Sequence, residues 1–442
     1  MFYLSKEREL DKALLEKMIQ RFNVDVRPQL QKWEDYYNGK QAILQKEYSD
    51  KSKPCSRTVT NYCKNIADSY CGYLASPSYI SYRSEADIAE LMEVLKANDY
   101  QQQDSELLLE ALTHGIAHEL CYLDELGQVR FSLIKATQCF GIYDERLAGD
   151  LLYFVRIYPV DQWDEVDNYA VDVYTPNEVR SYTMHGQGGY LTEVGAVPHY
   201  FSRCPANIFT LPDERSIFDC IMGLQDAANE LLSSEVDDYS AFCDAYLILQ
   251  GMDADAEDVA TMKEQRVLLI PDGGAASWLT KSANDAQVEN ILKRIHDSIY
   301  RVAQCPDFSS ETFVGGVSSG IAIRYRLTGM ETRAAKICAA MKKALQSRVN
   351  IISGVASLKS GEAAAEINID FKRNIPDDLS ATVNLVNALK GSVSDATLLS
   401  QLPFISDVNA ELEALQEQKA ANMELYGPMF TSTEDDAEED EQ

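Results

Sequence analysis

Apolar side chains recur at three- and four-residue spacing through the first 118 residues of the chain, which is the pattern of amphipathic helices. The pattern predicts helices over residues 6–40, 59–75, 85–98 and 104–118. Asn38-Gly39 is a strong stop signal for the first of them. The chain therefore begins with an α-rich unit.

The pattern changes over residues 120–200, where short alternating runs rich in Tyr, Val and Ile are separated by Gly, Pro and Asn. Runs such as LLYFVRIYPV and YAVDVYTPNEVRSYTM are typical of half-buried strands joined by turns. They predict an antiparallel sheet that ends near Pro212.

Helical spacing returns at Glu214 and predicts a long helix that stops at Gly251. A small insert follows, in which the runs RVLLIP and SWLTK read as two strands joined by the hairpin turn Asp272-Gly273-Gly274. Residues 285–304 predict a second helix, which Pro306 closes.

A Gly- and Ser-rich loop, DFSSETFVGGVSS, separates this helix from a long one over residues 320–352. The strand EINIDFKR and helices at 377–390, 394–402 and 407–426 are expected next, before an acidic tail that is too charged to form a core. The predicted fold class is α+β and predominantly helical.

The formal net charge of −30 argues against a protein that grips nucleic acid, because such affinity comes from Lys and Arg displacing counterions from phosphates. It is compatible with a surface past which DNA slides. The acidic stretch 214–244 suggests either a solvated or channel-facing helix side or a two-carboxylate metal site, and the first is favoured. The long helix has a basic face with two possible roles, which are ion pairing with acidic neighbours or attraction of phosphates. This face comprises Arg324, Arg326, Arg333, Lys336, Lys342, Lys343 and Arg348.

Motifs for enzyme chemistry are incomplete. Gly316-Val317-Ser318-Ser319-Gly320 matches the nucleophile elbow GxSxG, but no histidine follows it in the chain to complete a triad. His114 and His118 have a zinc-binding spacing, yet Gly115 stands where HExxH has its glutamate. There is no GxxxxGK[ST] phosphate loop and no CxxC among the ten cysteines. We therefore expect no enzyme, cofactor or metal. We also expect a soluble protein, because no apolar run reaches the ~20 residues of a membrane span.

Several segments, read in order, resemble the portal proteins of siphovirus-type tailed bacteriophages. They are WEDYYNGKQAI (33–43), SRTVTNYCKNIADSYCGYLASP (56–77), RSIFDCIMGLQDAANELLSSEVDDYSAFCDAYLILQG (215–251), VLLIPDGGAASWLTK (267–281), VENILKRIHDSIYRVAQCPDFSSETFVGGVSSGIAIRYRL (288–327) and INIDFKRNIPDDLSATVNLVNALKGSVSDATLLSQLPFISD (367–407). The sheet region matches in texture only, and the first thirty residues and the tail match little.

The resemblance implies a portal fold assembled as a closed ring, typically of twelve subunits, through which viral DNA is packaged and ejected at one capsid vertex. The wing, stem, clip and crown would divide the chain as follows. They are a wing at 1–213, stem helices at 214–250 and 285–304 around a clip at 251–284, a tunnel loop at 305–319, a long helix and strand at 320–369 returning to the wing, a crown at 370–426 and a disordered tail at 427–442.

The same resemblance implies partners and site residues. Expected partners are further copies of the chain, the terminase large subunit, head-completion or adaptor proteins, scaffold and major capsid protein, and weakly bound double-stranded DNA, with no membrane. The chain would reside in the virion, after assembly in the host cytoplasm. The DNA-facing tunnel loop would comprise Asp307, Phe308, Ser309, Ser310, Glu311, Thr312, Phe313, Val314, Gly315 and Gly316. Basic residues near DNA or a neighbouring subunit would be Arg324, Arg326, Arg333, Lys336 and Lys343, and the docking surface of the clip would include Asp272, Gly273, Gly274 and Trp278.

Two alternatives from other classes stay open at this point. One is a metal-dependent nuclease-type enzyme, and the other is a soluble acidic helical adaptor or scaffold protein. The central sheet and the uneven helix lengths disfavour a coiled-coil adaptor.

Overall fold

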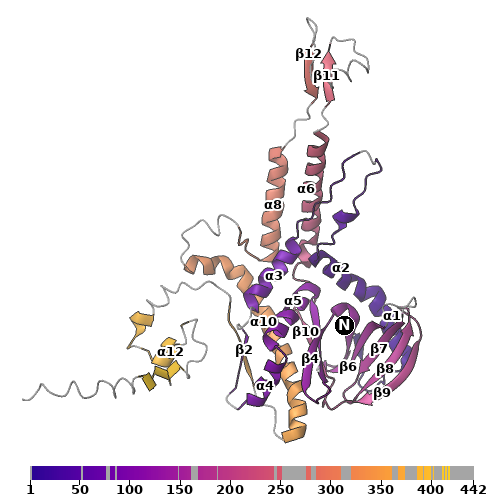
Figure 1. Ribbon diagram of the computed structural model, residues 1–442, viewed down its shortest axis with the longest axis vertical. Helices are drawn as coiled ribbons and strands as arrows, with labels where there is room; N and C mark the ends of the chain where they lie inside the picture. Colours follow the sequence, from indigo (N-terminus) through magenta and orange to yellow (C-terminus); the bar gives the residue numbers. More distant parts are fainter. Residues whose placement is uncertain are drawn as a thin grey trace, which may run out of the picture. The chain divides into compact units, whose positions relative to one another are not determined.

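The computed structural model in Figure 1 describes most of the chain. The described residues are 2–50, 53–75, 80–84, 87–147, 149–160, 168–186, 188–242, 246–250, 275–279, 285–309, 320–360, 367–373, 386–391, 393–399, 402, 411–412, 414–415 and 417–418. The chain divides into two compact units, one of residues 1–316 and 325–374 and the other of residues 317–324 and 375–442.

The first predicted helix is present but interrupted. Helix α1 (Lys12–Arg21) begins where the side chain of Asp11 accepts the N–H of Leu14, and a π-helical turn, η1 (Phe22–Val26), joins it to α2 (Arg27–Tyr37). Gly39 then takes a left-handed φ of +79°, which ends the helix as the sequence predicts. A short 3-10 turn, η2 (Ala42–Gln45), follows.

The next helices are α3 (Tyr62–Leu74), α4 (Ala89–Ala97) and α5 (Tyr100–His114). The prediction of a helix to residue 118 was wrong, because α5 ends at Gly115 with φ +77°. A side chain at Gly115 would meet the backbone of Arg215 at 2.7 Å, so this close approach requires glycine. His118 consequently lies on a strand, and the two histidines do not share a helix.

The predicted sheet region contributes to two sheets, the larger of which also includes a strand from the start of the chain, Phe2–Leu4. The strands are β1 (Phe2–Leu4), β3 (Ile116–Leu123), β4 (Val129–Ile134), β5 (Cys139–Asp144), β6 (Leu151–Val160), β7 (Asn168–Tyr174), β8 (Glu178–His185), β9 (Leu191–Pro198) and β10 (Ala206–Thr210). Six form the order β1-β5-β6-β7-β8-β9 and three the order β10-β3-β4. The pairings are antiparallel except that β1 runs parallel to β5.

The chain changes sheet at η3 (Ala136–Gln138), between β4 and β5. Side chains of both sheets then pack into one core, which includes Leu120 of β3 and Phe154 of β6. Helix α5 packs on the smaller sheet and contacts β3 and β4. The core is therefore a helix layer on a folded pair of sheets.

The second half contains two neighbouring helices, α6 (Met222–Phe242) and α8 (Asp285–Ala303), which pack on each other (Figure 1). A short 3-10 turn, η4 (Asp219–Ile221), leads into α6. Helix α6 is shorter than predicted, because β11 (Tyr246–Gln250) begins before Gly251. This strand pairs antiparallel with β12 (Ala275–Leu279), which places Trp278 opposite Leu247. RVLLIP and Asp272-Gly273-Gly274 lie outside the described residues.

Helix α10 (Gly320–Ser360) is longer than predicted, and its predicted apolar face is buried from Leu327 to Leu345. Strand β13 (Asn368–Phe371) confirms the predicted strand and pairs with β2 (Ile80–Arg83). In the second unit, α12 (Asp395–Leu399) lies within one of the three predicted helices. The acidic tail lies outside the described residues.

Candidate functional site

The helix pair α6 and α8 exposes apolar side chains along both helices. Val236 and Tyr239 of α6 are 44% and 75% exposed, and Ile291 and Val302 of α8 are 38% and 46% exposed. Exposed apolar side chains gathered on one pair of elements are typical of a protein–protein interface. The pair is therefore the first candidate for an assembly surface.

The acidic stretch is only partly the solvated face that the sequence suggested, because Glu214, Glu230, Glu235 and Asp238 are exposed whereas the other described carboxylates are used within the chain. Asp219 accepts the indole N–H of Trp33 at 2.7 Å, and Asp226 accepts the hydroxyl of Tyr36 at 2.8 Å. Burial and the hydrogen bond to Asp226 raise the pKa of Tyr36 well above its ordinary value. These carboxylates anchor α2 to the start of the helix pair.

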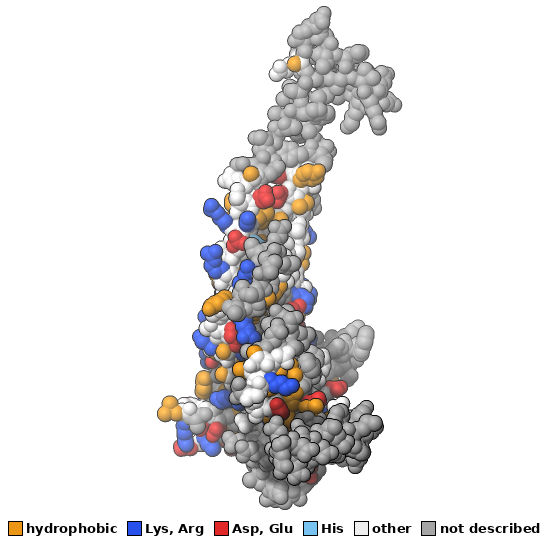
Figure 2. All heavy atoms as spheres, turned by 90° about the vertical axis from the view of Figure 1, so that its left-hand side faces the viewer, with side chains coloured by type: hydrophobic (Ala, Val, Ile, Leu, Met, Phe, Trp, Pro, Cys, Tyr) orange, Lys and Arg blue, Asp and Glu red, His pale blue; other side chains and the backbone are white. Residues whose placement is uncertain are grey.

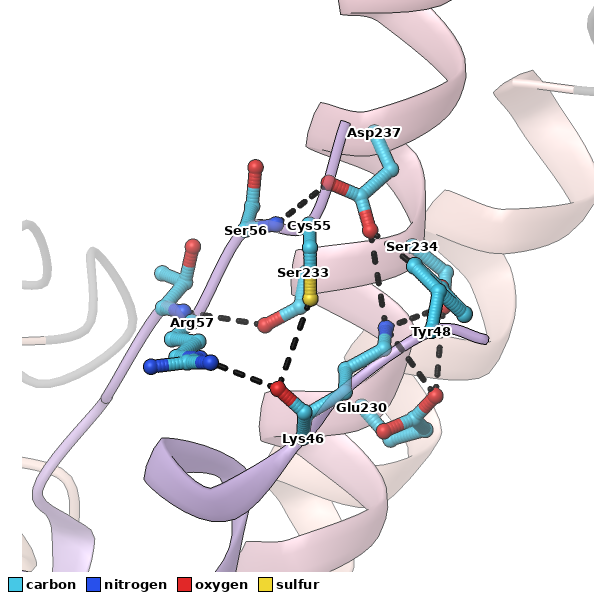
Figure 3. Close-up of polar contacts among 10 residues, drawn as sticks. Lys46, Tyr48, Cys55, Ser56, Arg57, Glu230, Ser233, Ser234 and Asp237 are labelled. Carbon is cyan, nitrogen blue, oxygen red and sulfur yellow. Dashed lines mark hydrogen bonds and ion pairs between the residues drawn. The ribbon is translucent and has the colours of Figure 1, made fainter. Parts of the chain in front are cut away.

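Asp237 is also used within the chain, as Figure 3 shows. It is 6% exposed and accepts the backbone N–H of Ser56 at 2.5 Å, while the amine of Lys46 lies 3.6 Å away. Burial opposes ionisation of Asp237, but the bond from Ser56 and the charge of Lys46 outweigh it and lower its pKa. Lys46 reaches Glu230 as well, at 3.2 Å.

The segment that leads into α3, residues 56–62, which we call the strap, runs along α6, and its last residue is the first of α3. Its alternate backbone N–H groups donate to side chains four residues apart. The bonds are Ser56 to Asp237 at 2.5 Å, Thr58 to Ser233 at 2.9 Å, Thr60 to Asn229 at 2.9 Å and Tyr62 to Gln225 at 2.8 Å. The match arises because two extended residues span ~6.7 Å and four helical residues ~6 Å.

The strap was missed by sequence reasoning. Its signal is the run Gln225, Asn229, Ser233, Asp237, a polar line at four-residue spacing in a helix. Gln225, Asn229 and Ser233 are completely buried. Buried polar groups require partners, so this line indicated a hydrogen-bonding neighbour rather than solvent.

A pocket of about 480 Å³ opens beside the strap between η2 and α6. Lys46, Asp226 and Glu230 line it together with Ala42, Ile43, Gln45 and Ala227. Lys46 pairs with Glu230, and the carboxylate of Asp226 accepts the neutral hydroxyl of Tyr36, so both carboxylates of the lining have partners within the chain.

The predicted basic face of α10 divides into exposed and internal members. Arg324, Arg326, Lys336 and Lys343 are exposed. Arg333 is half-buried and donates to the carbonyl of Ala303 at 3.2 Å. In the view of Figure 2, Lys and Arg side chains stand singly among acidic, polar and apolar ones.

Arg348, assigned to the same basic face, is completely buried, so its placement on that face was wrong, but it does pair with acidic neighbours, which is one of the two roles predicted for the face. Its guanidinium makes two bonds to Glu119, at 2.7 and 2.8 Å, and one to Asp104. Tyr82 donates to Asp104 at 2.7 Å, and Asn207 donates to Glu119 at 3.1 Å. The cluster joins α10 to α5, to both strands β3 and β10, and to β2.

The residues predicted for the tunnel loop are described only at its start. Asp307 turns back toward α8, where its carboxylate lies 3.6 Å from His296, and its other oxygen accepts the N–H of Ser309 at 3.0 Å. Phe308 is 41% exposed. Ser310, Glu311, Thr312, Phe313, Val314, Gly315 and Gly316 lie outside the described residues, as do Asp272, Gly273, Gly274 and the side chain of Trp278.

His114 and His118 occupy different settings. His114 lies 3.2 Å from Glu110, whereas the ring of His118 is buried against Phe154 and neither of its nitrogens has a hydrogen-bond partner among the described residues. Burial lowers the pKa of His118 to about 4, an effect only partly offset by Glu110. Across the described part of the chain, no three His, Cys, Asp or Glu side chains are arranged to hold a metal ion, and no helix is long and apolar enough to cross a membrane.

Comparison with known proteins gives two matches. The family described as "Phage portal protein, SPP1 Gp6-like" matches residues 17–425. The portal protein of Bacillus phage SPP1 is 22% identical over 416 residues, which cover 89% of this chain and 82% of that protein.

Proposed function

The chain belongs to the SPP1 Gp6-like family of phage portal proteins, and we propose that twelve copies of it form a closed ring at one capsid vertex through which double-stranded DNA is packaged and later ejected. As a portal protein it is a structural component of the phage capsid. The family match over residues 17–425 carries the proposal.

The α6/α8 pair supports ring assembly. A closed ring needs two different surfaces on each subunit that meet with a rotation that closes. Val236 and Tyr239 of α6 and Ile291 of α8 are exposed in the isolated chain. In a ring, the neighbouring subunit covers them, and the helix pair forms the stem wall.

The remaining segments take the family's other roles. Residues 1–213, with α10, form the wing, residues 251–284 the clip, residues 305–319 the tunnel loop, and residues 370–426 the crown. The clip, through Trp278 and the turn 272–274, docks the terminase large subunit and afterwards the head-completion proteins. Scaffold and major capsid protein assemble around the ring, in the host cytoplasm, and the portal nucleates the capsid.

Passage of DNA fits the charge of the chain. A net charge of −30 per subunit prevents strong adhesion of phosphates to the ring. Arg324, Arg326, Lys336 and Lys343 are exposed on α10, and ion pairing with acidic groups of a neighbouring subunit is the role we favour for them. DNA would then slide with little friction.

Mass measurement of the native particle, combined with negative-stain imaging, tests the ring. We expect rings without added nucleotide, with a channel wide enough for duplex DNA. A particle that stays a monomer or dimer at every salt concentration would contradict the proposal and favour an adaptor. Metal-dependent cleavage of DNA by the purified protein would favour a nuclease instead.

Binding of the ring to duplex DNA provides a second test. We expect weak binding at physiological salt, with an affinity that falls as salt rises. Sub-micromolar affinity at physiological salt would contradict a low-friction channel.

A further inference from the structure

Three helices meet at the C-terminal end of α8. The carbonyl of Ala303 accepts the hydroxyl of Tyr70, on α3, at 3.1 Å and the guanidinium of Arg333, on α10, at 3.2 Å. The same hydroxyl lies 3.1 Å from the carbonyl of Gln304. The guanidinium also stands 5.8 Å from the centre of the Tyr70 ring.

The end of α8 is a Schellman motif with an unusual residue at its left-handed position. The N–H of Gln304 bonds the carbonyl of Arg301 at 3.2 Å, and the N–H of Cys305 bonds that of Tyr300 at 3.1 Å. Gln304 has a φ of +54°, a conformation that usually falls to glycine at this position. A left-handed non-glycine residue costs ~1 kcal/mol or more and persists where its surroundings fix it.

Tyr70 and Arg333 supply that fixation from outside α8. Tyr70 and Ala303 are fully buried and Cys305 is 3% exposed, so solvent does not substitute for the two donors. Pro306 then prevents continuation of the helix, and Asp307 turns back toward His296 at 3.6 Å. The direction of the chain after α8 is therefore set at residues 303–307.

We propose that Tyr70 and Arg333 are positioning residues that fix the exit of the chain from α8 and transmit displacement of α10 to that exit. The carbonyl of Ala303 accepts from both residues. A shift of α10 along its axis would therefore withdraw the guanidinium of Arg333, while the hydroxyl of Tyr70 would stay bound. Arg333 thereby acts within the subunit, through the backbone of α8, rather than on DNA. The functional consequence rests on the proposed portal function, in which the segment after this exit faces the channel.

Helix α3 offers a matched control for the tyrosine. Tyr73, one turn beyond Tyr70, donates its hydroxyl to Glu331 of α10 at 2.7 Å and does not contact the end of α8 through that bond. Lys342 is an exposed cation of the same helix as Arg333. Tyr70→Phe and Arg333→Met can thus be compared with Tyr73→Phe and Lys342→Met, which remove a tyrosine hydroxyl and a cation elsewhere.

Hydrogen exchange of the full-length assembled protein is the first measurement. We expect the amides of Gln304 and Cys305 to exchange roughly five- to tenfold faster in Tyr70→Phe and Arg333→Met, the effect of losing one hydrogen bond. The amides should be unchanged in Tyr73→Phe and Lys342→Met. Equal exchange in the wild type and all four variants would overturn the proposal.

Packaging of DNA by heads built with each variant is the second measurement. We expect normal rings in all four variants, with packaging reduced severalfold in Tyr70→Phe and Arg333→Met alone. Packaging lost equally in Arg333→Met and Lys342→Met, with Tyr70→Phe normal, would show that charge matters and would overturn the positioning role. Failure of the wild-type chain to form rings would count against the portal function and leave the exchange result standing.

Discussion

Arg348 and Glu119 form a two-pronged ion pair in the interior of the protein, with Nε 2.7 Å from Oε2 and Nη2 2.8 Å from Oε1. The two residues are 229 positions apart in the chain. Neither has a significant exposed surface, and Asp104 adds a second carboxylate beside the same guanidinium. The pair fixes α10 on α5 and the smaller sheet.

Replacement of Arg348 by Met should be strongly destabilising, because it leaves two carboxylates buried without their cation. We expect a loss of about 3–5 kcal/mol in the free energy of unfolding, measured by denaturant titration at constant protein concentration. Lys342→Met, an exposed change on the same helix, should stay within about 0.5 kcal/mol. Partial recovery in the triple variant with Asp104→Asn and Glu119→Gln would support the charge argument, and a loss below about 1 kcal/mol in Arg348→Met would refute it.

Removal of one strap acceptor should loosen the strap locally. Asn229→Ala leaves the N–H of Thr60 without its partner at 2.9 Å, so we expect a loss of about 1–3 kcal/mol and faster exchange of the Thr60 amide. Glu235→Ala, on an exposed position of α6, is the control. If the Thr60 amide exchanges at the same rate in both variants, the bond from Thr60 to Asn229 does not protect it.

Acid should destabilise the fold before the carboxylates titrate. The pKa of buried His118 is lowered to about 4, so between its unfolded value near 6.5 and pH 4 the unfolded chain binds the extra proton. Stability therefore rises with pH across this window, and His118 contributes up to about 3 kcal/mol of the change. His118→Leu should flatten the plot of melting temperature against pH over the same range, and a wild-type slope in that variant would exclude His118 as the cause.

Glu110 adds to the same trend at lower pH. Its pKa is lowered despite burial, chiefly through His114, so its contribution is lost as pH falls through its folded value. His114→Gln should weaken this lower part of the acid transition. The upper part, which belongs to His118, should persist.

A charge on the exposed face of α6 should prevent ring formation without unfolding the subunit. Tyr239 is 75% exposed, and Tyr239→Glu should shift the native mass distribution toward subunits. Tyr190→Glu, at an 86% exposed position of the sheet region, should leave rings intact. Rings of normal mass in Tyr239→Glu would remove this face from the assembly surface.

Docking at the proposed clip should be separable from assembly. Trp278 pairs through its strand with Leu247, and large aromatic side chains are common anchors of interfaces. Trp278→Ala should leave ring mass unchanged and weaken capture of the terminase large subunit in a pull-down. Leu249→Ala, in the facing strand, serves as the comparison, and unchanged capture in Trp278→Ala would exclude the indole.

Much of the fold follows from local patterns. Asn38-Gly39, Pro306 and the apolar face of α10 predicted helix ends and a buried stripe that the structure contains. The family resemblance read from ordered segments is confirmed by the match over residues 17–425. Helix ends and buried helix faces are determined mainly by residues close in sequence, so the spacing of apolar residues predicts them.

The misses depend on distant partners. Arg348 reads as one more cation on a basic face until Asp104 and Glu119 are brought to it by tertiary folding. Strand β1 pairs with β5 across 140 residues, Phe2 lying opposite Ile142, and no local pattern specifies that parallel pairing. The sequence pattern predicts that Gly115 lies inside a helix. In the structure the backbone of Arg215 occupies the space that a side chain at this position would need.

The repeat distance of the strap and that of the side chains on α6 are close but not equal. Two extended residues advance ~6.7 Å and one turn of four helical residues ~6 Å, so three intervals accumulate a mismatch of ~2 Å. A ladder of this kind therefore stays short, and it ends at Tyr62, the first residue of α3. A shift of the strap by one residue would turn its donors away from α6. The four bonds therefore specify a single register between the chain that enters α3 and helix α6.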